Sequence, residues 1–245
     1  MDYLGHTIQI VDGKPHMSVQ HSKIRAITRL KPPDNVARVR GFCGAVNYLS
    51  RFLPELSTLL LPIRKLTRKG SKCEWTEECQ KSFEKIKELI TKPPVLVLPN
   101  PEGLIKLYID TSRQAVGCSI WQTEGVGSTK ERLIGYFSKN LPKTVLNYSI
   151  TELECVGLYI TISSIRLLKA RYFQVITDHS ALVHMSKSEK EIPTLRLKKL
   201  FEKLSGYNFD IFYQKGKELV ICDFLSRASY MTEEEESLID QTESV

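Results

Sequence analysis

Four carboxylates stand at positions where chemistry is expected, namely Asp110, Glu154, Asp178 and Asp223. Asp110 ends the stretch LIKLYID and Asp178 ends YFQVITD, and both stretches have the composition of strands. Active sites of mixed α/β sheets gather at such C-terminal strand ends. Carboxylates about 4–5 Å apart repel by roughly 3–4 kcal/mol per pair at an effective dielectric constant near 20. A cluster of this kind needs neutralising protons or cations, and hard oxygen ligands suit Mg²⁺ or Mn²⁺.

Three of these residues also have a purely structural interpretation. Asp110 could close an Asx turn, and Asp178 could cap the helix that follows it. Asp223 could pair with Arg227 one turn further along a helix. Taken together these interpretations require several coincidences, so the sequence favours one cluster at a sheet edge. Two divalent ions there would form the usual clamp for in-line attack on a phosphodiester.

Glu154 lies in the segment YSITELECVGLYITI, which is apolar almost all round and is therefore predicted to be a buried helix. Two capping boxes compete at its start, Ser149 with Glu152 and Thr151 with Glu154. If Ser149 caps the helix, Glu152 fills the N3 position and Glu154 has no local partner. A buried carboxylate without a partner is costly, so Glu154 would then need a metal ion or another cation.

Composition and charge describe an ordinary globular chain with a basic body. The 245 residues are 42% hydrophobic and 26% charged, without a long apolar run or a secretory signal at the start. The six cysteines contain no CxxC pair, which favours free thiols in a reducing compartment. The last fifteen residues carry six acidic groups, so residues 1–230 hold 35 basic against 22 acidic residues, a net charge of +13. A polyanionic partner fits that charge, although a merely basic surface is the alternative.

The order of predicted elements indicates a mixed α/β sheet flanked by helices. A proline-rich connector near residue 101 separates an upstream part from a downstream part. Upstream we expect a strand at 3–10 and helices at 18–30, 35–54 and 76–91. Downstream we expect strands at 104–110, 115–122, 131–138, 171–177 and 208–214, with helices at 150–169, 180–187, 193–206 and 218–228. Three strands in succession, followed by alternating helices and strands, give such a mixed sheet.

Ordered motifs along residues 3–229 resemble the C-terminal part of the pol polyprotein of gypsy-type long-terminal-repeat retrotransposons. YLGHTI resembles the end of a reverse transcriptase palm, and VRGFCGAVNYLSRFLPELSTLLLPIRKLTRKG is similar to the thumb. EWTEECQKSFEKIKELITKPPVLVLPNPE resembles the connection. The blocks YIDTS, YSITELE, VITDHSAL and KGKELVICDFLSRA match the four acidic blocks of the ribonuclease H domain, in the expected order.

This resemblance implies a ribonuclease H fold, a five-stranded mixed sheet flanked by helices and preceded by a small helical thumb-like segment. It divides the chain into a palm remnant at 1–30, thumb-like helices at 31–72, a connection at 73–101 and a ribonuclease H domain at 102–229. An acidic tail at 230–245 is expected to be disordered. No Y-x-D-D motif occurs, so no polymerase active site is expected in this chain.

The resemblance also implies a reaction, the two-metal hydrolysis of the RNA strand of an RNA/DNA hybrid. Asp110 would bridge two Mg²⁺ or Mn²⁺ ions. Glu154 and Asp178 would hold the ion near the leaving oxygen, and Asp223 would hold the ion that activates water. Residues expected to contact nucleic acid are Ser112, Arg113 and Gln114 after the first acidic block, and Arg38, Arg40, Lys65, Arg68 and Lys69 in the thumb-like segment.

Two further interpretations stay open. A domesticated or truncated element could keep the fold and the basic surface as a catalytically silent binding or scaffold subunit. The chain could also pair with the remaining palm and fingers of a reverse transcriptase, or with a second pol chain. We expect an intracellular, cytoplasmic protein without a membrane partner, with a virus-like particle or the nucleus as the alternative location.

Overall fold

The computed structural model describes residues 2–3, 6–11, 13–68, 70, 73–91, 93–145, 147–188 and 192–215. The predicted helix at 218–228, with Asp223, and the acidic tail lie outside the described residues, as does Lys69. No described helix is long and apolar enough to span a membrane.

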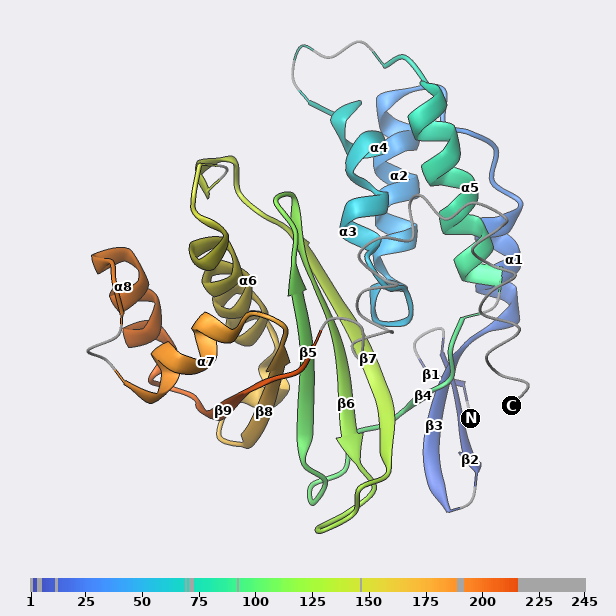
Figure 1. The fold of residues 1–245 in the computed structure, drawn as a ribbon. Helices are drawn as coiled ribbons and strands as arrows, with labels where there is room; N and C mark the ends of the chain where they lie inside the picture. The colour runs from blue at the N-terminus through green and yellow to red at the C-terminus, as the bar shows by residue number, and fades with distance from the viewer. Residues whose placement is uncertain are drawn as a thin grey trace, which may run out of the picture.

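The downstream part is built on a five-stranded mixed sheet with the order β7-β6-β5-β8-β9 (Figure 1). Its strands are β5 (Ile105–Thr111), β6 (Ala115–Thr123), β7 (Glu131–Asn140), β8 (Tyr172–Thr177) and β9 (Asn208–Tyr213). The pairs of β6 with β5 and with β7 are antiparallel, whereas β8 runs parallel to both β5 and β9. The predicted mixed sheet with flanking helices is therefore confirmed.

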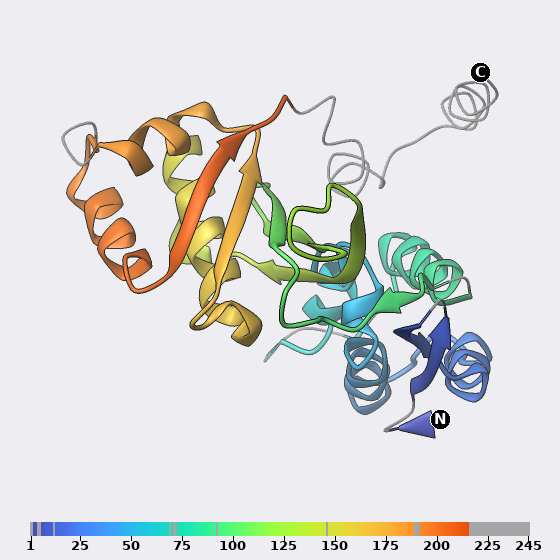
Figure 2. The ribbon, with the colours of Figure 1, turned by 90° about the horizontal axis from the view of Figure 1, so that it is seen from below.

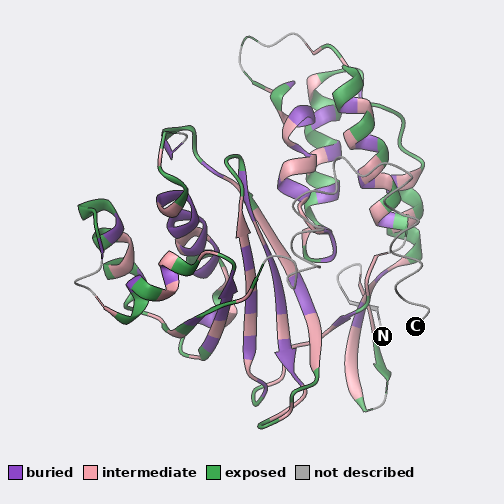
Figure 3. Ribbon diagram, viewed as in Figure 1, coloured by how far each residue is buried: buried purple, intermediate pink, exposed green. Residues whose placement is uncertain are grey.

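Helices α6 (Ile150–Ser164), α7 (Ser180–Lys187) and α8 (Leu195–Leu204) lie together on one side of this sheet (Figures 1 and 2). Alternation along β5 turns Ile105, Leu107 and Ile109 into a core that includes residues of α6. Most of α6 is buried, as its all-round apolar sequence predicts (Figure 3). The helix ends at Ser164 rather than near 169, because the chain continues as the 3-10 turn Arg166–Leu168.

The upstream part forms a second hydrophobic core between a helical layer and a small sheet. The sheet has the order β1-β2-β3-β4. Its strands are β1 (Asp2–Tyr3), β2 (His6–Val11), β3 (Lys14–Val19) and β4 (Leu96–Val97). The helices are α1 (His21–Thr28), α2 (Val36–Asn47), α3 (Leu56–Leu59), α4 (Leu61–Lys65) and α5 (Glu77–Thr91), with the 3-10 turn η1 (Ser50–Phe52).

Several details differ from the sequence predictions here. The helix predicted at 18–30 begins only at His21, because Lys14–Val19 forms a strand. The helix predicted over 35–54 ends at Asn47, and Leu53 is extended, as expected of a residue before proline. The stretch near residue 96 is a strand that pairs with β3 rather than a bare connector. The strand near residue 96 has a tertiary origin, because Met17 and Leu96 pair and are buried in the upstream core.

The two parts contact each other through η1, α3 and strand β7. The Ser57 backbone N–H donates to Ser138 Oγ at 3.0 Å, and Ser57 Oγ donates to the Ser138 carbonyl at 2.8 Å. Lys14 of β3 also forms an ion pair of 3.0 Å with Glu124, which follows β6. The turn before α3 is thereby held against the sheet face opposite to α6.

Candidate functional site

Asp110 and Asp178 lie at the same level of two neighbouring parallel strands. The register pairs Tyr108 of β5 with Ile176 of β8, and the two aspartates follow two residues later on each strand. Asp110 is the next-to-last residue of β5 and Asp178 directly follows the end of β8, so both lie at the C-terminal edge of the sheet. Asp110 is half-buried and Asp178 is exposed.

Glu154 approaches the same edge from helix α6. The Ser149 side chain accepts from the Glu152 backbone N–H, and the Glu152 carboxylate accepts from the Ser149 backbone N–H. Of the two capping boxes that the sequence leaves open, the structure therefore forms the one between Ser149 and Glu152. Glu152 is further paired with Arg196 at 2.6 Å. Glu154 takes no part in this cap and is buried, with only 7% of its surface exposed.

Electrostatic coupling joins Glu154 to both aspartates. Burial raises the pKa of Glu154 to about 8, and the negative charges of Asp110 and Asp178 contribute to this rise. The Thr111 hydroxyl acts in the opposite direction. Three of the four predicted carboxylates are thus brought to one edge, and the fourth, Asp223, lies outside the described residues.

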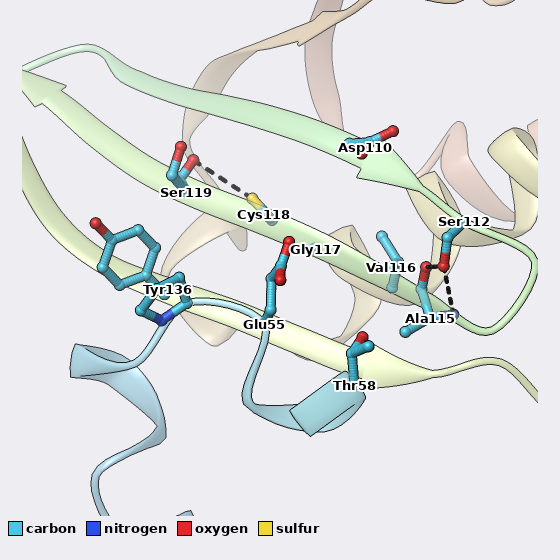
Figure 4. A pocket seen from close by; sticks show the side chains of 11 residues that line it. Glu55, Thr58, Asp110, Ser112, Ala115, Val116, Gly117, Cys118, Ser119 and Tyr136 are labelled. Carbon is cyan, nitrogen blue, oxygen red and sulfur yellow. Dashed lines mark hydrogen bonds between the residues drawn. The ribbon is translucent and has the colours of Figure 1, made fainter. Parts of the chain in front are cut away.

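A fifth carboxylate, Glu55, lines a pocket of about 50 Å³ together with Asp110. Figure 4 shows Glu55 reaching from the turn before α3 toward strand β6, beside Asp110 on strand β5. Burial raises its pKa to about 8, with a further contribution from Asp110. Its Oε1 atom is buried and has no hydrogen-bond partner among the described residues. Sequence reasoning missed Glu55, because nothing in RFLPELS indicates that this turn packs against a distant sheet.

The β5–β6 turn is closed by Ser112. Its backbone N–H donates to the Ala115 carbonyl at 2.9 Å, and its hydroxyl accepts from the backbone N–H groups of Gln114 and Ala115. Arg113 and Gln114 are exposed at the tip of the same turn, next to Asp110. The three residues after the first acidic block that are expected to contact nucleic acid therefore lie beside the carboxylate edge.

Of the basic residues predicted in the thumb-like segment, Arg38 and Arg40 lie on α2, Lys65 ends α4 and Arg68 follows it, whereas Lys69 lies outside the described residues. Arg38 is ion-paired with Asp34 across one helical turn. Arg40 and Arg68 are exposed, and neither forms an ion pair with another described residue. Lys65 lies 4.0 Å from Glu78 and is also exposed.

The donor set at the edge fits a hard divalent cation. Asp110, Glu154 and Asp178 offer only carboxylate oxygens, and burial together with the charges of the two aspartates raises the pKa of Glu154. Within the described ranges, no three acidic, histidine or cysteine side chains stand close enough to form a ready-made metal cage. The predicted use of Mg²⁺ or Mn²⁺ stays a prediction for these residues.

Comparison with known proteins places these features in a family. Residues 75–175 match the model of the RNase H-like domain found in reverse transcriptase. The Transposon Tf2-3 and Tf2-4 polyproteins of Schizosaccharomyces pombe are each 31% identical over 225 residues, or 91% of this chain. The chain spans 16% of the length of these relatives.

Solved structures share the fold across both parts of the chain. A foamy viral protease-reverse transcriptase (dRH) in complex with double-stranded DNA has a TM-score of 0.69 at 19% identity, covering 87% of this chain and 37% of that one. The same viral protein in complex with an RNA/DNA hybrid has a TM-score of 0.67 at 18% identity, covering 87% and 29%. The chain therefore belongs to the retrotransposon polyproteins, as a segment that carries the ribonuclease H-like domain of a reverse transcriptase.

Proposed function

We propose that this chain hydrolyses the RNA strand of RNA/DNA hybrids at the edge formed by Asp110, Glu154 and Asp178, with two Mg²⁺ or Mn²⁺ ions. The observation that supports the proposal is that parallel β5 and β8 end near Asp110 and Asp178, whose charges help to raise the pKa of the buried Glu154. Asp223 completes the proposed ligand set. Divalent ions in such a site supply an activated water and neutralise charge on the phosphodiester.

The protein contributes rigid positioning of negatively charged oxygen atoms. Strands β5 and β8 pair as neighbours in the sheet, so the strand ends that carry Asp110 and lead into Asp178 are held in place by the sheet. The capped start of α6 fixes Glu154 from the other side. Because these groups are held before substrate arrives, little reorganisation is needed during the reaction.

Binding of the hybrid would combine two surfaces. Arg113 and Gln114, exposed beside Asp110, are placed to approach the ribose, where the 2′-hydroxyl distinguishes RNA from DNA. Arg40 and Arg68 are the predicted thumb-like residues free to meet phosphates, whereas Arg38 already has Asp34 as its partner. We further propose that the polymerase part of a reverse transcriptase assists this binding, since the relatives are much longer chains.

The test is cleavage of a labelled RNA/DNA hybrid in Mg²⁺ or Mn²⁺ by the wild type and by Asp110→Asn. Asp210→Asn is the matched control, because Asp210 is an exposed aspartate on β9 whose partner is the Tyr172 hydroxyl. We expect cleavage of the RNA strand alone, lost in Asp110→Asn and kept in Asp210→Asn. Double-stranded DNA and double-stranded RNA of the same sequence should stay intact.

Absence of cleavage, with equal hybrid binding by all three proteins, would instead support the catalytically silent binding subunit. In either case the contribution of Arg40 and Arg68 is measurable from the salt dependence of binding. Log K falls as log salt rises, and each phosphate contact removed should make this negative slope shallower by about 0.7–0.9.

A further inference from the structure

Gly157 lies in the middle of α6, where glycine is unfavourable for a helix and needs a local reason. A Cβ atom built on Gly157 would lie 2.1 Å from Oγ1 of Thr111, 2.8 Å from its Cγ2 and 3.0 Å from its Cβ. Rotation of the Thr111 side chain cannot relieve this overlap, because its Cβ is itself too close. Thr111 therefore occupies the space that a side chain at position 157 would need.

The contact joins the two elements that carry Asp110 and Glu154, two of the proposed metal ligands. Thr111 is the last residue of β5 and follows Asp110, with its side chain on the α6 side of the sheet. Gly157 follows Glu154 by three residues, so both lie on the same side of α6. The separation between the end of β5 and α6 thus determines how close the two carboxylates come.

We propose that Thr111 and Gly157 form a size-matched pair that sets the separation of Asp110 and Glu154. Both are positioning residues, and the inference rests on the proposed metal site. A methyl group at position 157 would push α6 outward by roughly 1 Å. Misplacement on this scale costs on the order of 100-fold in rate when groups must be aligned.

The experiment compares the wild type with Gly157→Ala, Thr111→Ala and the double variant. In the double variant the two Cβ atoms start 3.0 Å apart and need to separate by only about 0.4 Å to reach ordinary contact at 3.4 Å. Thr111→Val is a fourth variant, because it keeps the bulk at this position and removes the hydroxyl next to Glu154. Unfolding is followed in EDTA, and Mg²⁺ affinity is obtained from the rise in melting temperature with Mg²⁺ concentration.

In EDTA we expect Gly157→Ala to lower the melting temperature and the double variant to recover most of the loss. With Mg²⁺ we expect Gly157→Ala to bind at least tenfold more weakly, and the double variant to return to within a few-fold of the wild type. With Gly157 in place, Thr111→Val should keep the melting temperature of the wild type in EDTA, because valine has the bulk of threonine. If Gly157→Ala does not fold, folding of the double variant supports size matching, and failure of both overturns it.

Two results would overturn the proposal with different consequences. Equal Mg²⁺ affinity in the wild type and in Gly157→Ala would show that the pair does not position the site. A double variant as weak as Gly157→Ala would show that the two residues are not matched in size. If Mg²⁺ has no effect on any protein, including the wild type, the proposed function fails and positioning fails with it, even where EDTA unfolding still shows size matching.

Discussion

Replacing Glu154 by glutamine should stabilise the metal-free protein at alkaline pH. The pKa of Glu154 is raised to about 8 in the folded state from an ordinary value of 4.5. Between these values the folded state binds a proton that the unfolded state has released, so stability falls as pH rises. The slope is about 1.4 kcal/mol per pH unit for one proton. Because Glu154 is only 7% exposed, little of the effect is screened by solvent.

The expected gain for Glu154→Gln in EDTA at pH 8 is on the order of 2–4 kcal/mol, and it should vanish near pH 4.5. Adding Mg²⁺ should offset most of this gain. A cation bound at 100 times its Kd stabilises the wild type by about 2.7 kcal/mol, and the variant has lost one of its ligands. The assay is urea unfolding at pH 4.5, 6 and 8, with EDTA or with Mg²⁺.

Glu152→Gln is the matched control, two residues away on the same helix. Hydrogen bonds from Ser149, chiefly from its backbone N–H, and the Arg196 guanidinium lower the pKa of Glu152. Its contribution to stability is therefore present above pH 4.5 and is lost as pH falls. This variant should lose about 1 kcal/mol at pH 7, with or without Mg²⁺. Identical pH profiles for Glu154→Gln and the wild type in EDTA would refute the buried, charge-coupled position of Glu154.

Three further predictions concern the packing of the two parts. Ser138→Ala removes the acceptor of the buried Ser57 N–H and should cost about 1–3 kcal/mol in urea unfolding, with faster hydrogen exchange at Ser57; unchanged exchange would contradict the contact. Phe83→Ala should cost about 3–5 kcal/mol in the same assay, since Phe83 is 2% exposed in the upstream core, and a loss below 1 kcal/mol would contradict that burial. The pKa of Glu124 is lowered to about 2, chiefly by its hydrogen bond with Lys14, so Glu124→Gln should reduce the melting temperature at pH 7. The difference in melting temperature between variant and wild type should shrink as pH falls from 4.5 toward 2. An equal difference at pH 2 would argue against the ion pair.

The downstream sheet was predictable because its signals are local. Alternation along β5 and the apolar run of β8 mark strands that end near Asp110 and Asp178. The sequence also identified the two capping boxes that compete at the start of α6, but it did not decide between them. Ser149 with Glu152 leaves Glu154 without a cap role, and the structure shows this choice. Periodicity and caps act over one or two turns, which is the range that sequence patterns report.

The contacts between the upstream part and the sheet were not predictable in this way. Glu55 reaches Asp110 from 55 residues earlier in the chain, on a turn with the left-handed φ of 49°. Strand β4 has only two residues and forms because β3 is there to pair with it. Both features depend on tertiary packing, whereas propensity describes only neighbours along the chain. The roles of Asp110, Glu154, Asp178 and Asp223 remain predictions.

Asp110 links the two parts of the molecule electrostatically. Its charge contributes to the raised pKa of Glu154 on α6 and to that of Glu55 before α3. Neutralising Asp110, by substitution or by a bound cation, must therefore lower the pKa of both Glu154 and Glu55. By linkage, the charge of Asp110 affects proton binding by Glu55, and the charge of Glu55 affects Asp110 by the same free energy. The pKa of Glu55, before α3, and that of Glu154, on α6, thus both depend on the charge of Asp110, although the three residues lie on different elements.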